Sequence, residues 1–415
     1  MENTPNQGAI ADGKSILDQI LNNNQAEQVA RLDAVEITEN LLSQLNERER
    51  DVLRRRFGLA GTEKETLENI GAAHKLTRER IRQIETSSVK KLRALKNLEE
   101  YIISLRRAIN QLLEEHGGLM EKDYLLNNLV NFSAGGLRGK EEEATKHKNH
   151  LDFLISRLLH DHFEEVRSSK HFKDSFKLKH QVLDHLEETA NELVGKIKEV
   201  KQLFATEELI SKLKELESFQ KYQDKFDLNY NLDISNVLGG ELFQENADVI
   251  NANKALYSLL QASKQIEQNK FGHWGLADWR EIRPKTINDK IYLVLKNEGK
   301  PMHFVDITTK INQISFDEKP ANAATVHNEL ILDDKYVLVG RGLYSLKEWG
   351  YKQGTVLDVI KEILEKDGNG LTRDQIIERV LDQRLVKKAT IVLALMDRDL
   401  FEKVDNRYQL KKKEL

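Results

Sequence analysis

A pattern of apolar residues recurs four times after residue 98 and limits the fold more than any other feature of this sequence. Each copy has a segment with helical spacing, a turn, and an apolar pair five residues apart that opens a second short helix. Each copy ends with an aromatic residue two positions before a leucine, in an alternation of period two that predicts a strand. The apolar pairs are Met120 and Leu125, Phe204 and Leu209, Met302 and Ile307, and Leu371 and Ile376. The aromatic and leucine pairs are Phe176 and Leu178, Trp274 and Leu276, Tyr344 and Leu346, and Tyr408 and Leu410.

Three helices followed by a hairpin make a winged helix, because the hairpin closes one end of a helical core that is too small to stand alone. We therefore expect a mainly α fold with small β wings, in which about four winged-helix modules follow one another. Their expected ranges are 99–180, 181–283, 284–350 and 351–415, the last with a basic tail. The same strands would also fit small α+β cores that have no role in DNA binding.

The composition excludes several kinds of chemistry. The 415 residues include no cysteine, which excludes disulfides, thiolate metal sites and a cysteine nucleophile and suits a reducing cytoplasm. No apolar run approaches the roughly 18 residues of a membrane span, and residues 1–33 are expected to form a flexible tail. The histidines from His147 to His185 lack a converging carboxylate or thiolate set, so we expect them on a polar helix surface. No catalytic, cofactor or metal site is predicted, and the chain is not expected to be an enzyme.

Residues 75–96 carry a concentrated positive charge. They contain eight lysines and arginines against two glutamates, a net +6 in a chain whose net charge is −4. Such a local excess of cations concentrates the attraction for phosphate at one place. The basic residues are Lys75, Arg78, Arg80, Arg82, Lys90, Lys91, Arg93 and Lys96.

The same part of the chain has the pattern of a helix-turn-helix. Its shared core would consist of Leu67, Ile70, Leu76, Ile81 and Ile84. Thr77 then suits the N-cap of the second helix. With the apolar positions inside, the outer face near the start of that helix carries Arg78, Glu79, Arg82 and Gln83.

These outward residue types fit the reading of base edges. Arginine can form two parallel hydrogen bonds to guanine, glutamate accepts from the cytosine amino group, and glutamine pairs with adenine. The predicted DNA-binding residues are Thr77, Arg78, Glu79, Arg80, Arg82, Gln83, Lys90 and Lys91, and the candidate phosphate contacts are Lys387 and Lys388. A solvated basic helix face would account for the charge alone, but not for its coincidence with the apolar register and the cap.

Residues 41–95, and above all TRERIRQIE from Thr77 to Glu85, resemble region 4 of the sigma-70-type bacterial sigma factors. The resemblance implies that a helix-turn-helix domain at 34–98 recognises a −35-like element in double-stranded promoter DNA, with Arg78, Glu79, Arg82 and Gln83 at family positions that touch bases or neighbouring phosphates. It also implies contact with the β flap of RNA polymerase. No aromatic-rich stretch resembles the sigma region that melts the −10 element, so a complete sigma factor is not expected.

The third copy, with GKPMHFVDI and GRGLYSLKEW, resembles the HARE-type winged helix of the RNA polymerase delta subunit and of chromatin and restriction proteins. Its third helix is expected around 325–332, where there is no lysine or arginine, so a protein-docking role stays open beside DNA binding. Three functions follow from the two resemblances. The first is a cytoplasmic, nucleoid-associated bacterial transcription protein that reads promoter DNA, the second a delta-like polymerase accessory subunit, and the third the DNA-targeting subunit of a restriction or defence system.

Overall fold

The computed structural model describes residues 33–133, 141–167, 169–226, 247–351, 354–384 and 386–411. The chain divides into two compact units, and each is described by itself. Unit 1 consists of Met1–Glu267 with Trp274–Ala277, and unit 2 of Gln268–His273 with Asp278–Leu415. The tail predicted at 1–33, apart from Asp33, and the last lysines of the basic tail lie outside the described residues. The six-part domain division stays a prediction.

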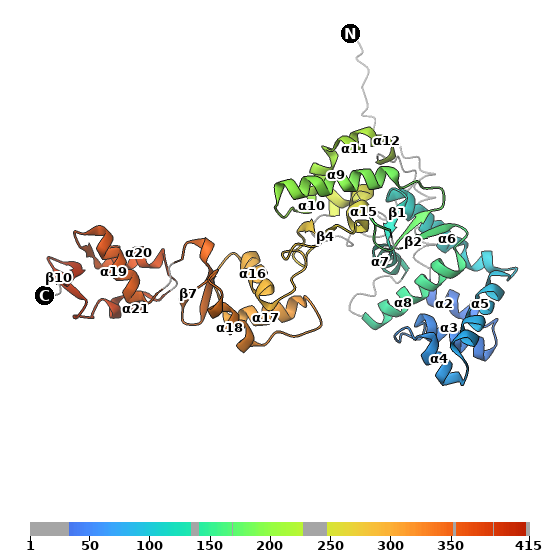
Figure 1. Cartoon of the computed structure of the whole chain (residues 1–415), viewed down its shortest axis with the longest axis horizontal. Coiled ribbons are helices and arrows are strands. Elements are labelled where there is room, and N and C mark those ends of the chain that lie inside the picture. Colours follow the sequence, from blue (N-terminus) through green and yellow to red (C-terminus); the bar gives the residue numbers. More distant parts are fainter. Residues whose placement is uncertain are drawn as a thin grey trace, which may run out of the picture. The chain divides into compact units, whose positions relative to one another are not determined.

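The described chain is mainly helical, and the described part of unit 1 begins with four helices, drawn in blue in Figure 1. They are α2 (Ala34–Leu42), α3 (Glu47–Phe57), α4 (Leu67–His74) and α5 (Arg78–Arg93). Polar caps start them, because Asp33, Asn46, Thr66 and Thr77 each accept hydrogen bonds from backbone amides of the first turn.

The core between α3, α4 and α5 is the predicted one. Val52, Ile70, Ile81 and Ile84 are buried together, with Leu67 and Leu76 packed against them. The turn between α4 and α5 needs a glycine at position 71, because a Cβ there would lie 2.7 Å from the backbone oxygen of Leu76. The helix-turn-helix prediction is confirmed in its core and in its cap.

Two of the four recurring copies follow in unit 1. The first has α6 (Leu98–Glu115), β1 (Leu119–Glu121), α7 (Lys122–Ser133), α8 (Glu141–Phe153), the π-helix η1 (Leu154–Leu158), β2 (Phe163–Val166) and β3 (Ser175–Leu178). The second has α9 (Asp184–Val200), α10 (Thr206–Lys214), α11 (Glu217–Lys221), α12 (Gln223–Phe226), α14 (Ala247–Asn251), α15 (Lys254–Ala262), β4 (Ile266–Gln268) and β5 (Trp274–Leu276).

Unit 2 contains the other two copies. The third has α16 (Ile287–Glu298), β6 (Met302–His303), α17 (Phe304–Ile314), α18 (Ala323–Leu332), β7 (Tyr336–Gly340), β8 (Leu343–Leu346) and the short 3-10 helix η2 (Lys347–Trp349). The fourth has α19 (Val356–Asp367), β9 (Leu371–Thr372), α20 (Arg373–Leu381), α21 (Lys388–Ala394), β10 (Phe401–Val404) and β11 (Arg407–Leu410). The capping-box spacing of Thr372 and Gln375 is realised at α20.

The strands of each copy form one small antiparallel sheet. The first, third and fourth copies have the same strand order, in which the last strand of the hairpin lies in the middle: β1-β3-β2, β6-β8-β7 and β9-β11-β10. The second copy has β4 beside β5, and an isolated bridge from Phe204 to Trp274 stands where the others have a strand. Within the described residues, each copy therefore has one antiparallel sheet, and three of these sheets share the same strand order.

The structure corrects one part of the predicted pattern. The first residue of each apolar pair does not begin a helix but lies on a strand or bridge before it, opposite the aromatic residue of the same copy. The partners are Met120 and Phe176, Phe204 and Trp274, Met302 and Tyr344, and Leu371 and Tyr408. The two signals seen in the sequence are therefore cross-strand neighbours in all four sheets.

The histidine prediction was wrong in part. His150 and His185 are buried and do not lie on a polar surface. Among the described residues, none of the helices is both long enough and apolar enough to cross a bilayer.

Candidate nucleic-acid interface

The N-terminal half of α5 presents the predicted DNA-reading residues to solvent. Ile81 and Ile84 point into the core, and the positions between and before them are exposed. The exposed residues are Thr77, Arg78, Glu79, Arg80, Arg82 and Gln83. The helical period therefore separates a buried apolar face from an outward face that carries donors and acceptors suited to base edges.

The outward side chains form ion pairs and hydrogen bonds with one another and with Glu68 of α4. Arg78 Nε lies 3.0 Å from Glu68 Oε1 on α4, and two Arg82 nitrogens donate to the Glu79 carboxylate at 2.7 and 2.8 Å. Arg80 Nη1 donates to Gln83 Oε1 at 3.1 Å. The hydrogen bond from Arg82 lowers the pKa of Glu79, so this carboxylate stays charged. Exposed ion pairs contribute little to stability, so DNA can replace these partners at small cost.

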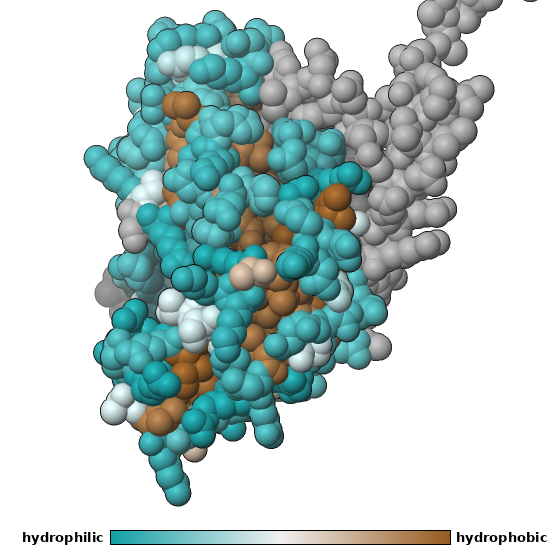
Figure 2. Space-filling model, turned by 90° about the vertical axis from the view of Figure 1, so that its right-hand side faces the viewer, coloured by the Kyte–Doolittle hydropathy of each residue, from teal (hydrophilic) through white to brown (hydrophobic). Residues whose placement is uncertain are grey.

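The two lysines predicted near the end of α5 face different surroundings. Lys90 is exposed. Lys91 forms an ion pair with Glu49 near the start of α3. Glu49 is buried and belongs to the capping box of that helix. Both lysines are exposed, but Lys91 has a partner on α3. Figure 2 shows one face of the molecule, on which hydrophilic side chains predominate and hydrophobic ones appear in separate strips.

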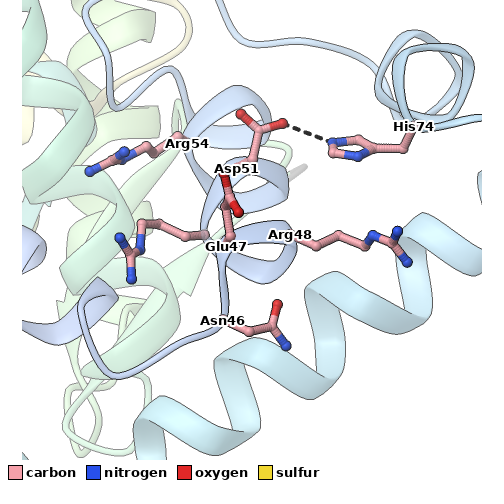
Figure 3. Close-up of a pocket in the computed structure, with 7 residues that line it drawn as sticks. Asn46, Glu47, Arg48, Asp51, Arg54 and His74 are labelled. Atoms are coloured by element: carbon pink, nitrogen blue, oxygen red, sulfur yellow. Dashed lines mark hydrogen bonds and ion pairs between the residues drawn. The ribbon is translucent and has the colours of Figure 1, made fainter.

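A hollow beside α3 brings together charged residues that sequence reasoning did not single out (Figure 3). Its lining consists of Asn46, Glu47, Arg48, Arg50, Asp51, Arg54 and His74. His74 Nε2 lies 2.8 Å from Asp51 Oδ2, which ties α4 to α3. Arg50 donates to the backbone oxygens of Leu42 and Leu45 at 3.2 and 3.1 Å, so this arginine holds the α2–α3 turn. The only sequence signal was the charge-dense ERERDVLRRR stretch.

Lys387 and Lys388, the two candidate phosphate contacts in unit 2, mark the start of α21. Lys387 is the N-cap residue and Lys388 the first helical residue, and both are exposed. They belong to unit 2, whereas the predicted α5 residues belong to unit 1. Within the described parts of the chain, no three histidine, aspartate or glutamate side chains come together in a way that could hold a metal ion.

The exposed basic helix on a helix-turn-helix core defines the first 60 or so described residues as a DNA-binding module of the helix-turn-helix class. More specifically, residues 41–94 match the family described as Sigma-70, region 4, a DNA-binding module that is not an enzyme. The match includes all eight DNA-binding residues predicted in this part of the chain.

Known sigma factors are similar to this chain over the same region. RNA polymerase sigma factor RpoD of Helicobacter pylori is 44% identical over 88 residues, which are 21% of this chain and 12% of that protein. SigA of Microcystis aeruginosa is 43% identical over 95 residues, 22% of this chain and 21% of the relative. SigA of Lactococcus lactis subsp. cremoris is 51% identical over 55 residues, 13% of this chain and 15% of the relative. The chain spans only about a fifth or less of the length of these relatives.

Proposed function

We propose that this chain is a DNA-binding protein of bacterial transcription, cytoplasmic and nucleoid-associated, which recognises a −35-like promoter element through α5. The exposed outer face of α5, inside a region 4 match of 44% identity to a sigma factor, is the observation that carries the proposal. RNA polymerase, through its β flap, is the protein partner that this similarity favours.

The roles of the α5 residues follow from their chemistry. Arg78 and Arg82 donate to guanine or to adjacent phosphates, Glu79 accepts from a cytosine amino group, and Gln83 pairs with adenine. Thr77 and Arg80 flank these positions, and Lys90 contacts the phosphate backbone. Before DNA binds, Glu68 and Glu79 hold the arginines in place. On binding, the arginines exchange these carboxylates for DNA.

The four recurring copies are proposed to be winged helices. Their order of helix, strand, helix, helix and hairpin, with the last strand central in the sheet, supports this assignment. The third copy is proposed to be of the HARE type. These copies dock polymerase, flanking DNA or another protein.

The test is to measure DNA affinity of the full chain by fluorescence anisotropy at fixed salt. One duplex carries a promoter −35 element, and the other carries the same bases in scrambled order. Replacing Arg78 or Gln83 by alanine should cost about 1–3 kcal/mol on the matched duplex and much less on the scrambled one. Lys90→Ala should weaken both duplexes alike. Equal losses on both duplexes for all three variants would contradict base recognition.

A polymerase accessory subunit, in which DNA contact is secondary, is the second candidate. One observation favours it: α18, the third helix of the HARE-like copy, carries no lysine or arginine along Ala323–Leu332. Purified core polymerase should retain the full chain even when Arg78 and Gln83 are both alanine, if this alternative holds. A gene for a nuclease or a methylase beside this one would instead favour the DNA-targeting subunit of a restriction or defence system.

A further inference from the structure

Helix α8 is the third helix of the first copy, the position from which a helix-turn-helix module normally reads the major groove. It carries Lys146, His147 and Lys148 close together, but Glu141, Glu142, Glu143 and Asp152 give the helix a net charge of −2. The structure places the C-terminal half of α8, and η1 after it, against the region 4 module instead. The contacts are polar, ionic and aromatic, and they come from residues far apart in the sequence.

The polar contacts are hydrogen bonds from α8 to the turn that follows α3. Asn149 Nδ2 donates to the backbone oxygen of Gly58 at 3.0 Å, and His150 Nε2 donates to the backbone oxygen of Leu59 at 2.8 Å. His150 and Leu59 are both buried. The Gly58 oxygen also accepts from the Gly61 amide at 3.1 Å. Because a buried carbonyl without a donor is costly, the hydrogen bond from His150 to Leu59 is the one that matches α8 to this turn.

An ionic contact lies next to the turn. The Asp152 carboxylate lies 2.8 Å from Lys64 Nζ of the region 4 module and 2.6 Å from Lys122 Nζ of α7. Burial alone would raise the pKa of Asp152, but the hydrogen bonds from Lys122 and Lys64 outweigh it and lower that pKa. One charged carboxylate thus joins the two modules.

Aromatic and backbone contacts complete the interface. The rings of Phe57 and Phe153 have centroids 4.9 Å apart, and the Arg157 guanidinium lies 5.3 Å from the centroid of Phe57. The Arg157 backbone oxygen accepts a hydrogen bond from Arg93 Nε at 2.7 Å. Since Arg93 is the last residue of α5, η1 holds the far end of the DNA-reading helix.

We propose that α8 and η1 form a docking element whose partner is the region 4 module of the same chain, and that this element is not a second DNA-reading helix. The proposal rests on the proposed function only where it concerns DNA. Docking fixes the orientation of α5 relative to the first copy. It also covers the face formed by Phe57, Gly58 and Leu59, so any other protein that binds this face must displace α8.

In the second copy, the helix that corresponds in position to α8 is α15, which directly precedes the hairpin and is in this sense the third helix of that copy. It is used in a comparable way. Helix α15 is buried along almost its whole length. Ser258 Oγ donates to the Leu119 backbone oxygen of β1 at 2.6 Å, and Lys254 Nζ lies 3.3 Å from Glu115 Oε2 of α6 in a fully buried ion pair. Within the described part of unit 1, the third helices of both copies therefore serve packing, and α5 keeps an exposed basic face.

A disulfide tests the docking directly. A Cβ on Gly61 would lie 3.9 Å from the Cβ of Lys146, a separation that suits a disulfide. The full chain has no cysteine, so a bridge in Gly61→Cys/Lys146→Cys can join only these two positions. Oxidation should produce it in nearly all molecules, seen by mass spectrometry and by mobility on a non-reducing gel.

The matched control is Gly61→Cys/Lys148→Cys, because residue 148 is two positions further along the helix and faces away. This pair should stay reduced under the same conditions. Gly61 has φ of +84°, so Gly61→Cys alone reports the strain of the new side chain through its melting temperature. Equal bridging in both pairs, or none in the first, would overturn the docking.

DNA binding then tests whether the docked form is the one that binds DNA. The bridged protein should bind the promoter duplex within about twofold of its reduced form, since docking leaves α5 exposed. Lys148→Glu should change affinity by less than about twofold, and Lys90→Glu should lower it by about tenfold with a shallower salt dependence. Loss of binding on bridging, or equal losses for the two charge reversals, would show that α8 lies at the DNA and would overturn the proposal. Absence of DNA binding by the unaltered chain would refute the proposed function alone.

Discussion

The third helices of the two units differ in what covers them, although the copies share one order of elements. In unit 1, α8 packs on the region 4 module and α15 packs on β1 of its neighbour. In unit 2, Leu332 at the end of α18 is 79% exposed and Leu393 of α21 is 68% exposed. The same local architecture therefore supports two kinds of third helix. One kind is buried against a neighbouring module, and the other has large apolar side chains exposed.

This difference shows that the use of a helix is decided by its neighbours and not by its own composition. The Lys146–Lys148 stretch of α8 carries two lysines, yet the second half of that helix is buried in a protein interface. Helix α18 has no lysine or arginine and has an exposed apolar end. Charge along a helix indicates where phosphate is attracted, but only tertiary contacts show whether phosphate can reach it.

The largest expected effect on stability comes from truncating a buried side chain in the α8 interface. Phe153→Ala should lower the free energy of unfolding of unit 1 by about 3–5 kcal/mol, because Phe153 is fully buried and packs on Phe57. The matched change in unit 2 is Leu393→Ala on α21, which should cost under about 0.5 kcal/mol because that side chain is exposed. Urea unfolding of the full chain, followed by hydrogen exchange of each unit, measures both. Similar losses for the two variants would break the comparison.

A second large effect is expected at α15. Lys254→Met should destabilise unit 1 by about 3 kcal/mol, because it removes the cation opposite the buried Glu115. Replacing both partners, with Glu115→Leu added, should recover most of the loss. Equilibrium unfolding of the single and double variants distinguishes an uncompensated charge from lost packing, since lost packing alone would make the double variant worse.

Local patterns in the sequence predicted the elements that depend on nearby residues. The core of the helix-turn-helix, the Thr77 cap and the hairpin strands all follow from spacing and residue type, and the structure has them. The strand before the second helix escaped prediction, because two or three residues are too few to show a period. Its signal was nevertheless present, since Met302 was noted and pairs with Tyr344.

The docking of α8 could not be predicted from the sequence. Asn149 and its acceptor Gly58 are separated by 91 positions, and no local period links such residues. The polar composition of α8 indicated a solvated surface, and His150 was therefore placed there wrongly. For the candidate site, the residue types and their outward face were predictable, whereas the partner of Lys91 was not, because Glu49 lies on another helix.

A smaller effect, on the pH dependence of stability, is expected at the α8 interface of unit 1. Burial lowers the pKa of His150, and the nearby Lys146 and His147 lower it further. The hydrogen bond to Leu59 and the charge of Glu39 act in the opposite direction but do not outweigh burial. The folded state therefore binds a proton less readily than the unfolded state, and the docked form is fully stabilised above about pH 6.5. As pH falls below that value, stability should be lost until the folded pKa is passed.

The variant His150→Gln isolates this contribution, because glutamine can donate to the Leu59 oxygen without titrating. The unfolding free energy of the original chain should fall more steeply between about pH 6.5 and 5 than that of the variant, by at most about 1.4 kcal/mol per pH unit. His185 is buried too and its pKa is also lowered, so a common residual slope is expected in both proteins. Parallel curves would mean that His150 is not held neutral at the interface.

The smallest expected effect is the one that tests the open helix of unit 2. Leu332→Gln at the end of α18 should change the free energy of unfolding by no more than about 0.5 kcal/mol, because the exposed leucine makes few apolar contacts that a polar side chain would remove. Leu260→Gln near the end of α15 should cost several times more, since it places an amide in a fully buried site. A loss above about 1 kcal/mol for Leu332→Gln in the isolated full chain would mean that α18 is covered in solution. The two units would then use their third helices alike, and α18 would have to be regarded as a packing helix like α8.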